Sequence, residues 1–462
     1  MPHPVSLAQS LHDVLSDLHQ RPYPHVPNPP SCKKRASVAL ILRVRPTYNH
    51  WPDASSLSPP DGSASVPQRL DTFFSQSWVQ NGEPEAIFIK RASRVGDRWT
   101  GHVALPGGKR DPGDVDDKAA AIRETAEEIG LDLTTSDCIH VGNLPERVVT
   151  SSWGTVPYVL FLNLSCENTH SADRLLPRLM VLCPYVFLLT SSDSPTLRLQ
   201  PTEVASTHSV PLRALLSPSM RTVEHVDMSQ RLANMGGLMS RLAYRSLMGY
   251  MQFAAIRLAP TESLQCNSTP GYVPGGIQPS TSLLQRWKSW CLGSQADSSS
   301  QGQPLLLWGL TLGILADFLD MLPPHTAVQL WKYPNFTALD LRFIINILTY
   351  RLRKHNRHQV KSGARPSNTA VDGQTAALPV TETTGSHGDL DHNNQVGIGG
   401  LGVGRYYGSS DKDPAASTYA VGIMLQGYYD RVRAAIYIFL AWRVALGSTA
   451  AIYAWRLVRQ LK

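Results

Sequence analysis

The chain has 462 residues, of which 42% are hydrophobic and 17% charged, so it is long enough for a sizeable core and more than one domain. Six cysteines are scattered without a CxxC pair, which argues against a zinc finger and favours a reduced, intracellular compartment. The net charge of +7 is concentrated in residues 351–365 and 430–462. It therefore belongs to a linker and a tail, and no nucleic-acid partner is expected.

Residues 1–35 are rich in proline, histidine and polar side chains, and they predict a flexible leader. No apolar segment precedes Pro22, so no secretory signal is expected. Short β-branched or apolar runs predict strands at 36–45 and 85–91, and the Ser/Pro-rich stretch 51–68 between them predicts a surface insertion.

Further strands are expected where apolar or β-branched runs lie between polar turns: 156–164, 179–190, 196–199 and 253–257. Helices are expected at 210–216 and at 305–322, the second ending at a proline pair. This mixed order of strands and helices predicts an α/β sandwich.

Two polar stretches, 261–303 and 356–418, predict loops because they cannot bury enough apolar surface to offset the entropy of ordering. The chain therefore divides into a domain over 36–355, a polar linker over 356–418 and a tail over 419–462. Within the tail, 434–455 carries Arg443 as its single charge and exceeds the roughly 20 residues that cross a bilayer. It predicts a membrane anchor, a helix lying on a membrane, or a helix packing on a partner. The orientation of an anchor is open because both flanks are basic.

The strongest chemical signal lies within residues 105–131, which read LPGGKRDPGDVDDKAAAIRETAEEIGL. An apolar stripe at helical spacing predicts a helix that ends at Gly130. Glu124, Glu127 and Glu128 stand at i, i+3 and i+4, so their carboxylates share one face. An exposed acidic helix is the simple alternative, but three adjacent carboxylates also suit a hard divalent cation, Mg²⁺ or Mn²⁺.

The residues around this helix favour the metal-binding interpretation. Gly107 and Gly108 allow a tight turn in which the backbone can approach a metal or a phosphate closely. Arg123 precedes the first glutamate and can orient a carboxylate through two hydrogen bonds. A bound cation would neutralise charge on a leaving phosphate and activate a water molecule, which predicts metal-assisted hydrolysis of a diphosphate.

The segment resembles the Nudix family, whose box is written G-x5-E-x7-R-E-U-x-E-E-x-G-U, with U an aliphatic residue. The residues that match are Arg123, Glu124, Glu127, Glu128, Gly130 and Leu131. Asp114 stands where the family has its first glutamate, and one extra residue separates it from Arg123. The resemblance implies a Nudix-type α/β/α sandwich with a mixed sheet. It also implies metal binding by the three glutamates, with Glu124 a candidate for activating water.

The upstream stretch IFIKRASRVGDRWTGHVALPGG resembles the coenzyme A diphosphatase branch of this family. That resemblance implies cleavage of coenzyme A to 4′-phosphopantetheine and 3′,5′-ADP. Arg91, together with Arg94 or Arg98, would bind the substrate phosphates, and Glu203 is a candidate for a further carboxylate at the site. The simple alternative is that these arginines and Glu203 are solvated surface residues. The alternatives are hydrolysis of another nucleoside diphosphate derivative, such as NADH or ADP-ribose, and a catalytically silent Nudix module held at a membrane.

Overall fold

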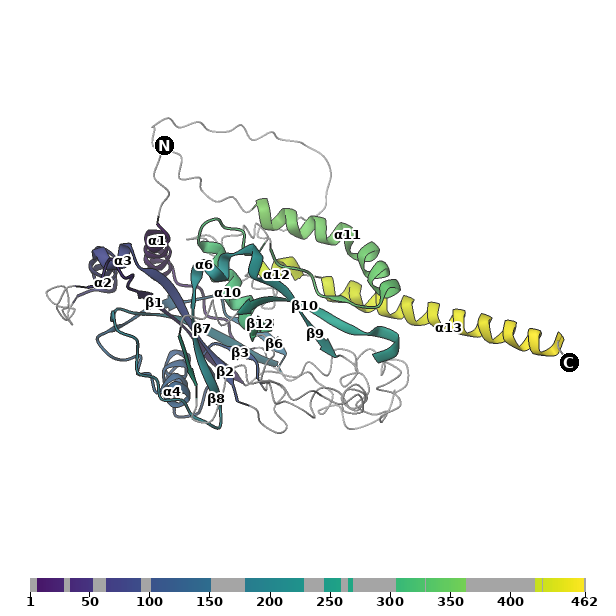
Figure 1. The fold of residues 1–462 in the computed structure, drawn as a ribbon, viewed down its shortest axis with the longest axis horizontal. Coiled ribbons are helices and arrows are strands. Elements are labelled where there is room, and N and C mark those ends of the chain that lie inside the picture. Colours follow the sequence, from purple (N-terminus) through teal and green to yellow (C-terminus); the bar gives the residue numbers. More distant parts are fainter. Residues whose placement is uncertain are drawn as a thin grey trace, which may run out of the picture.

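The computed structural model describes residues 6–28, 34–52, 64–92, 101–150, 179–227, 245–258, 265–268, 305–362 except 329, and 420–460 except 426. A mixed sheet crosses the middle of the molecule (Figure 1). Its central strand β1 (Arg35–Arg45) pairs antiparallel with β2 (Glu83–Arg91) and parallel with β7 (Leu179–Leu189). This combination confirms the expected mixed sheet.

The remaining strands of this sheet pair with β1, β2, β7 or β8. β8 (Val204–Pro211) pairs with β2, and β11 (Gln265–Ser268) pairs with β8 at that edge. The other strands are β5 (Cys138–Asn143) and β6 (Arg147–Thr150) on β7, β3 (Val103–Ala104) on β2, and β4 (Gly107–Lys109) on β1.

Helix α4 (Asp117–Ile129) covers one face of the main sheet. Its first turn is capped by Asp116, whose side chain accepts a hydrogen bond from the Ala119 amide, and it ends at Gly130 in the left-handed region (φ 67°). Ile129 packs with sheet residues such as Ile41 and Phe187 in a small buried cluster. This packing sets the height and rotation of α4 above the strands.

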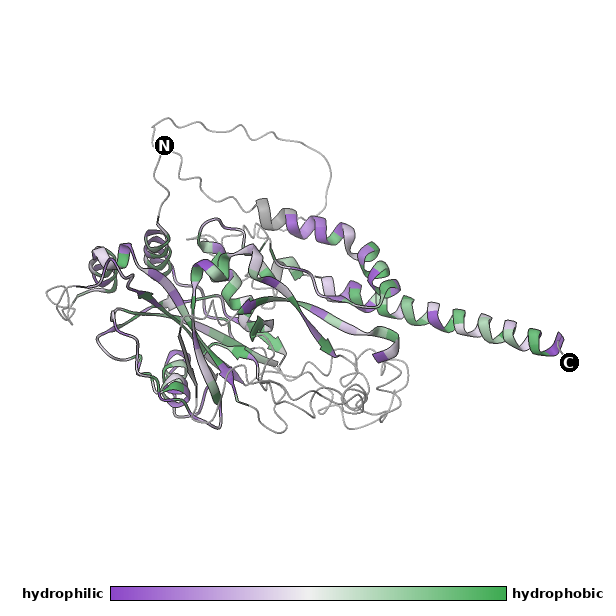
Figure 2. Ribbon diagram, in the orientation of Figure 1, coloured by the Kyte–Doolittle hydropathy of each residue, from purple (hydrophilic) through white to green (hydrophobic). Residues whose placement is uncertain are grey.

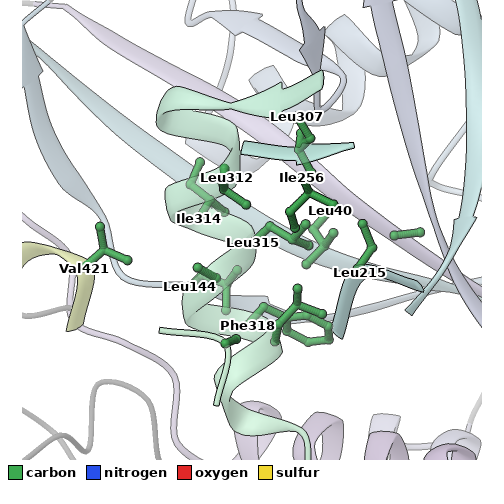
Figure 3. Close-up of a cluster of buried hydrophobic side chains, with 14 of the residues drawn as sticks. Leu40, Leu144, Leu215, Ile256, Leu307, Leu312, Ile314, Leu315, Phe318 and Val421 are labelled. Atoms are coloured by element: carbon green, nitrogen blue, oxygen red, sulfur yellow. The ribbon is translucent and has the colours of Figure 1, made fainter. Parts of the chain in front are cut away.

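The opposite face carries a larger core made with a second, four-stranded sheet. That sheet contains β12 (Leu305–Trp308), β10 (Tyr250–Leu258), β13 (Asn335–Phe336) and β9 (Arg221–Asp227). The short helices α6 (Leu212–Leu216) and η3 (Pro218–Met220) connect β8 to β9. Between the sheets lies α10 (Gly309–Met321), whose Leu315 and Phe318 meet Leu40 of β1 and Ile256 of β10 (Figure 3).

The N-terminal segment corrects one expectation. Within the expected flexible leader 1–35, residues 7–20 form helix α1 (Leu7–Gln20), which begins at the N-cap Ser6. Leu11 and Leu15 are fully buried, and α1 packs against α2 (Val66–Phe74), near α3 (Ser77–Gln80), and against β5. The leader interpretation is therefore wrong for these residues, because their apolar positions recur at helical spacing and find a core.

The C-terminal helices also pack on the domain. α11 (Leu339–Ser362) contacts both α12 (Ala420–Leu425) and α13 (Tyr428–Gln460). The Asn356 side chain donates to the Met424 carbonyl at 3.0 Å, and the Tyr428 hydroxyl donates to the Pro334 carbonyl. In α13, Val432, Ala435 and Phe439 are buried, whereas residues 441–460 are exposed and extend away from the domain (Figure 1).

Several expected elements differ in detail from the structure. Residues 196–199 form no strand, 305–308 are strand β12 rather than the start of a helix, and 66–68 belong to α2 rather than to the insertion. The polar linker begins later than expected, because α11 continues to residue 362. The expected strand 156–164 and most of the expected loops 261–303 and 356–418 lie outside the described residues.

Candidate active site

The glycine turn and the end of α4 form one compact site. Strand β4 pairs Gly107 and Gly108 with β1, which places their backbone beneath the glutamates of α4. The Gly107 amide donates to Glu128 Oε2 at 2.9 Å. A Cβ on Gly108 would lie 2.3 Å from the Glu124 carboxylate carbon, closer than real contacts allow. Glycine is therefore required here for the carboxylate to occupy its position.

Arg123 ties the loop to the helix. It donates from Nε to Asp114 Oδ1 at 3.0 Å and from Nη2 to Asp114 Oδ2 at 3.1 Å. The same guanidinium reaches the Lys109 carbonyl at 3.0 Å, Glu124 at 3.2 Å and Glu127 at 3.1 Å. Its five hydrogen bonds link four groups from the loop and the helix, so Arg123 is a positioning residue for Glu124.

The pKa shifts of Glu124 and Glu128 indicate which charged groups act on these two carboxylates. Burial raises the pKa of Glu128 to about 7, and the negative charges of Glu124 and Glu203 also raise it, while the Gly107 amide and the charge of Arg91 act in the opposite direction. Burial likewise raises the pKa of Glu124, with further contributions from Glu127 and Glu203 and opposition from Arg123. Glu203, which precedes β8, therefore acts on both glutamates and belongs to this site.

The three glutamates that were predicted to bind a metal differ in their exposure to solvent. The Glu127 side chain is 57% exposed and bound to Arg123, whereas Glu124 is largely shielded and Glu128 is buried. Glu124, Glu128 and Glu203 form the set whose mutual repulsion and burial a cation would relieve. Their hard oxygen ligands, with Gly108 leaving room for Glu124, fit Mg²⁺ or Mn²⁺.

A second group of ligand-type side chains lies at the start of α4. Among the described residues, His25, Asp117 and Glu146 bring ligand atoms within 4.8 Å of one another. Arg35 occupies the centre of this group, with its guanidinium 2.7 Å from both Asp117 and Glu146. The cluster is therefore an ion-pair network that fixes the first turn of α4, with the guanidinium in the place of a metal.

Of the other predicted site residues, some lie at the site and others lie outside the described residues. Arg91 ends β2, and its charge acts on Glu128. Arg94 and Arg98 lie outside the described residues. The role of Asp114 was left uncertain by the spacing of the box. In the structure each of its carboxylate oxygens accepts a hydrogen bond from Arg123. The sequence signal for Asp114 was an acid at the box position of the family's first glutamate, despite the longer loop.

Comparisons with known proteins agree with this geometry. The NUDIX domain model matches residues 77–232. An uncharacterized protein of Schizosaccharomyces pombe is 31% identical over 346 residues, covering 74% of this chain and 82% of that protein. The chain belongs to the Nudix family, and its domain is a Nudix hydrolase domain.

More specific matches are shorter. The mitochondrial coenzyme A diphosphatase of Homo sapiens is 40% identical over 79 residues, which cover 17% of this chain and 32% of that enzyme. The match thus spans about a third of the diphosphatase. A solved Nudix hydrolase from M. smegmatis covers 39% of this chain and 71% of its own, with 13% identity and a TM-score of 0.21, too low to support an argument.

Proposed function

We propose that this protein is a Mg²⁺- or Mn²⁺-dependent hydrolase that cleaves the diphosphate of coenzyme A or its derivatives to 4′-phosphopantetheine and 3′,5′-ADP. The observation that carries the proposal is the set of shielded carboxylates, Glu124 and Glu128 with Glu203, above the backbone of Gly107 and Gly108. The short match to a coenzyme A diphosphatase supports this substrate over other nucleoside diphosphates.

In this proposal Glu124, Glu128 and Glu203 hold the cation, and Glu127 joins them from the exposed side of α4. The cation, when bound, neutralises charge on the diphosphate and makes a coordinated water molecule a better nucleophile. The Gly107 amide fixes the Glu128 carboxylate by its hydrogen bond. Arg123, held by Asp114, fixes the Glu124 carboxylate, the candidate for accepting a proton from the attacking water.

Arg91 is the proposed phosphate-binding residue for which the structure gives a position. It stands where β2 leaves the sheet, and its positive charge acts on Glu128. A guanidinium beside the carboxylate cluster can bind a phosphate oxygen without repelling the cation from its ligands. Arg94 and Arg98 follow on the same segment and are proposed to bind the 3′-phosphate of coenzyme A.

The test is a substrate panel with the full chain and Mg²⁺: coenzyme A, acyl-coenzyme A, NADH, ADP-ribose and dinucleoside polyphosphates. Formation of 3′,5′-ADP from coenzyme A supports the proposal. Faster hydrolysis of NADH or ADP-ribose would assign the second candidate, a Nudix hydrolase of another nucleoside diphosphate.

Loss of activity in Glu124→Gln, but not in the control Glu83→Gln, is expected. Glu83 lies at the opposite end of β2 from Arg91 and pairs with Arg213 of α6. Equal activity in the wild type and Glu124→Gln, or no turnover of any substrate, would refute the enzymatic proposal and favour the silent binding module.

We also propose that α13 holds this intracellular enzyme at a membrane. In the part of the chain that the structure describes, one helix is long and apolar enough to cross a bilayer, and it is α13, with 33 residues. Its exposed part carries Trp442, Tyr453 and Trp455. Sedimentation of the full chain with cellular membranes tests this location, and complete recovery in the soluble fraction would refute it.

A further inference from the structure

We infer that α11 provides a second membrane-binding surface, an exposed apolar stripe bordered by basic residues that fits the surface of an anionic lipid bilayer. In this arrangement α13 lies along the bilayer surface and does not cross it. The inference deepens the proposed membrane association of α13, and it is independent of the proposed hydrolase activity.

The stripe consists of four large apolar side chains that face away from the domain. Leu339 is 80% exposed, Phe343 67%, Ile347 59% and Tyr350 64%. Their spacing of four, four and three residues places them on one side of the helix. The opposite side of α11 is buried through Leu341, Ile345 and Thr349. The inner face therefore accounts for packing on the domain, and the outer face has no role in it.

Basic side chains border and extend the stripe. Arg342, Arg351 and Lys354 are exposed, and Arg357 is exposed as well, although its guanidinium lies over the ring of Tyr333. The one acid of α11, Asp340, is engaged with Arg443 of α13 at 2.7 Å. An apolar face edged by arginine and lysine is the pattern of helices that lie at the boundary between headgroups and acyl chains of anionic membranes. The same charges would repel one another if two stripes packed face to face in a dimer.

The stripe begins where α13 leaves the domain. The Arg443 Nε to Asp340 Oδ2 hydrogen bond joins this point of α13 to the first turn of α11, next to Leu339. Beyond it, the exposed half of α13 carries large apolar and aromatic side chains. Its hydrophobic residues appear as recurring green segments of the ribbon in Figure 2. The two helices therefore offer lipid-compatible side chains on both sides of one junction.

The same junction shortens the part of α13 available for crossing a bilayer. Phe439 and Ala435 are fully buried, and Arg443 is paired with Asp340. The apolar run beyond these contacts therefore extends only from Val444 to Trp455, between Arg443 and Arg456. Those 12 residues fall short of the roughly 20 that a transmembrane helix needs. Tyr453 and Trp455 are residue types enriched at the membrane interface.

The experiment is sedimentation of the full-length protein with vesicles of phosphatidylcholine alone or of phosphatidylcholine mixed with phosphatidylserine. We expect the wild type to bind the mixed vesicles more strongly, and Phe343→Ser/Ile347→Ser to lower its partition coefficient at least about tenfold. The matched control is Tyr48→Ser/Trp51→Ser, which removes two exposed aromatic side chains, 98% and 64% exposed, between β1 and α2.

A second variant, Arg342→Gln/Lys354→Gln, tests the charge and should reduce the preference for phosphatidylserine while leaving weak binding to phosphatidylcholine. If Phe343→Ser/Ile347→Ser lowers the melting temperature, Leu339→Gln/Tyr350→Gln tests the same face. If these apolar variants bind the vesicles as strongly as the wild type does, α13 alone is sufficient for membrane binding and the inference is overturned.

A lipid-free dimer of the wild type that Phe343→Ser/Ile347→Ser converts to a monomer would assign the stripe to a second copy and also overturn it. Hydrolysis of soluble coenzyme A by the same variants separates these results from a failure of the proposed activity.

Discussion

The Arg123 guanidinium holds both carboxylate oxygens of Asp114, at 3.0 and 3.1 Å, and from that fixed position reaches Glu124 at 3.2 Å. Asp114 lies in the loop and Glu124 on α4, so the pair couples the loop conformation to the orientation of a proposed metal ligand. Hydrogen bonding by Arg123 keeps the pKa of Asp114 below its usual range, so the pairing persists through neutral pH.

We expect Asp114→Asn to lower kcat by about 10- to 100-fold, as is typical when a residue that orients a metal ligand is altered. Restoration of part of the activity by higher Mg²⁺ would identify the defect as ligand orientation. The matched control is Asp111→Asn, because Asp111 is 66% exposed and lies 3.8 Å from the same guanidinium. Equal losses in both variants would contradict a special role for Asp114.

Gly108→Ala should reduce activity on the order of 100-fold, because displacement of a reacting or binding group by about 1 Å can cost that much. The added Cβ would lie 2.3 Å from the Glu124 carboxylate and force it to move. Gly113→Ala is the control in the same loop, since a Cβ there meets nothing within 4 Å. The activity should be titrated with Mg²⁺ in both variants. Normal Mg²⁺ dependence in Gly108→Ala would count against the proposed ligand role of Glu124.

The buried His208 predicts acid sensitivity of the fold. Burial, with a smaller contribution from Lys90, lowers its pKa from 6.5 to about 4. The unfolded chain therefore takes up a proton at a higher pH than the folded chain does. The contribution of His208 to stability is present above pH 6.5 and is lost as the pH falls from 6.5 to 4.

His208→Gln should remove up to about 3 kcal/mol of the stability that the wild type loses over this range, measured by urea unfolding at several pH values. Glutamine can still bond to Ser206 Oγ, which lies 2.9 Å from the histidine ring. His225→Gln, an exposed histidine on β9, should follow the wild-type profile. Parallel profiles for the wild type and His208→Gln would show that His208 does not cause the acid sensitivity.

Arg147→Ala should destabilise the protein by about 3–5 kcal/mol, because it leaves the buried Asp317 carboxylate without its cation. The two side chains are 2% and 0% exposed and lie 2.7 Å apart, joining β6 to α10. Arg433→Ala, which removes an exposed pair with Asp430, should cost less than about 1 kcal/mol. Chemical denaturation of both variants provides the comparison. Similar small losses would mean that the buried pair contributes little to stability.

The helical half of the site was predictable because it depends on local spacing. Residues at i, i+3 and i+4 share a face wherever the helix packs, so Glu124 and Glu128 emerge together. The grouping with Glu203 was not predictable from spacing, because the residue comes from a turn that strand pairing brings across the sheet. The different exposure of the three glutamates on α4 depends on side-chain orientation, which the spacing leaves undetermined.

The elements that were misassigned show two different causes. In α1 the helical spacing of Leu7, Leu11 and Leu18 is present after Ser6, but the proline-rich residues that follow concealed it. At 305–322 an apolar run suits a strand and a helix equally. Gly309, with φ 70°, turns the chain from β12 into α10, so the residues before it pair with β10 and the residues after it are helical.

The packing of α12 and α13 on α10 and α11 has a consequence for the integrity of the chain. Side-chain contacts hold the last 43 residues on the domain independently of the peptide that joins them. These contacts are the Asn356 to Met424 hydrogen bond, the buried Tyr428 and Phe439, and the Arg443 to Asp340 pair. A single proteolytic cut between residues 363 and 419 would therefore produce two fragments that remain together under native conditions and separate only in denaturant.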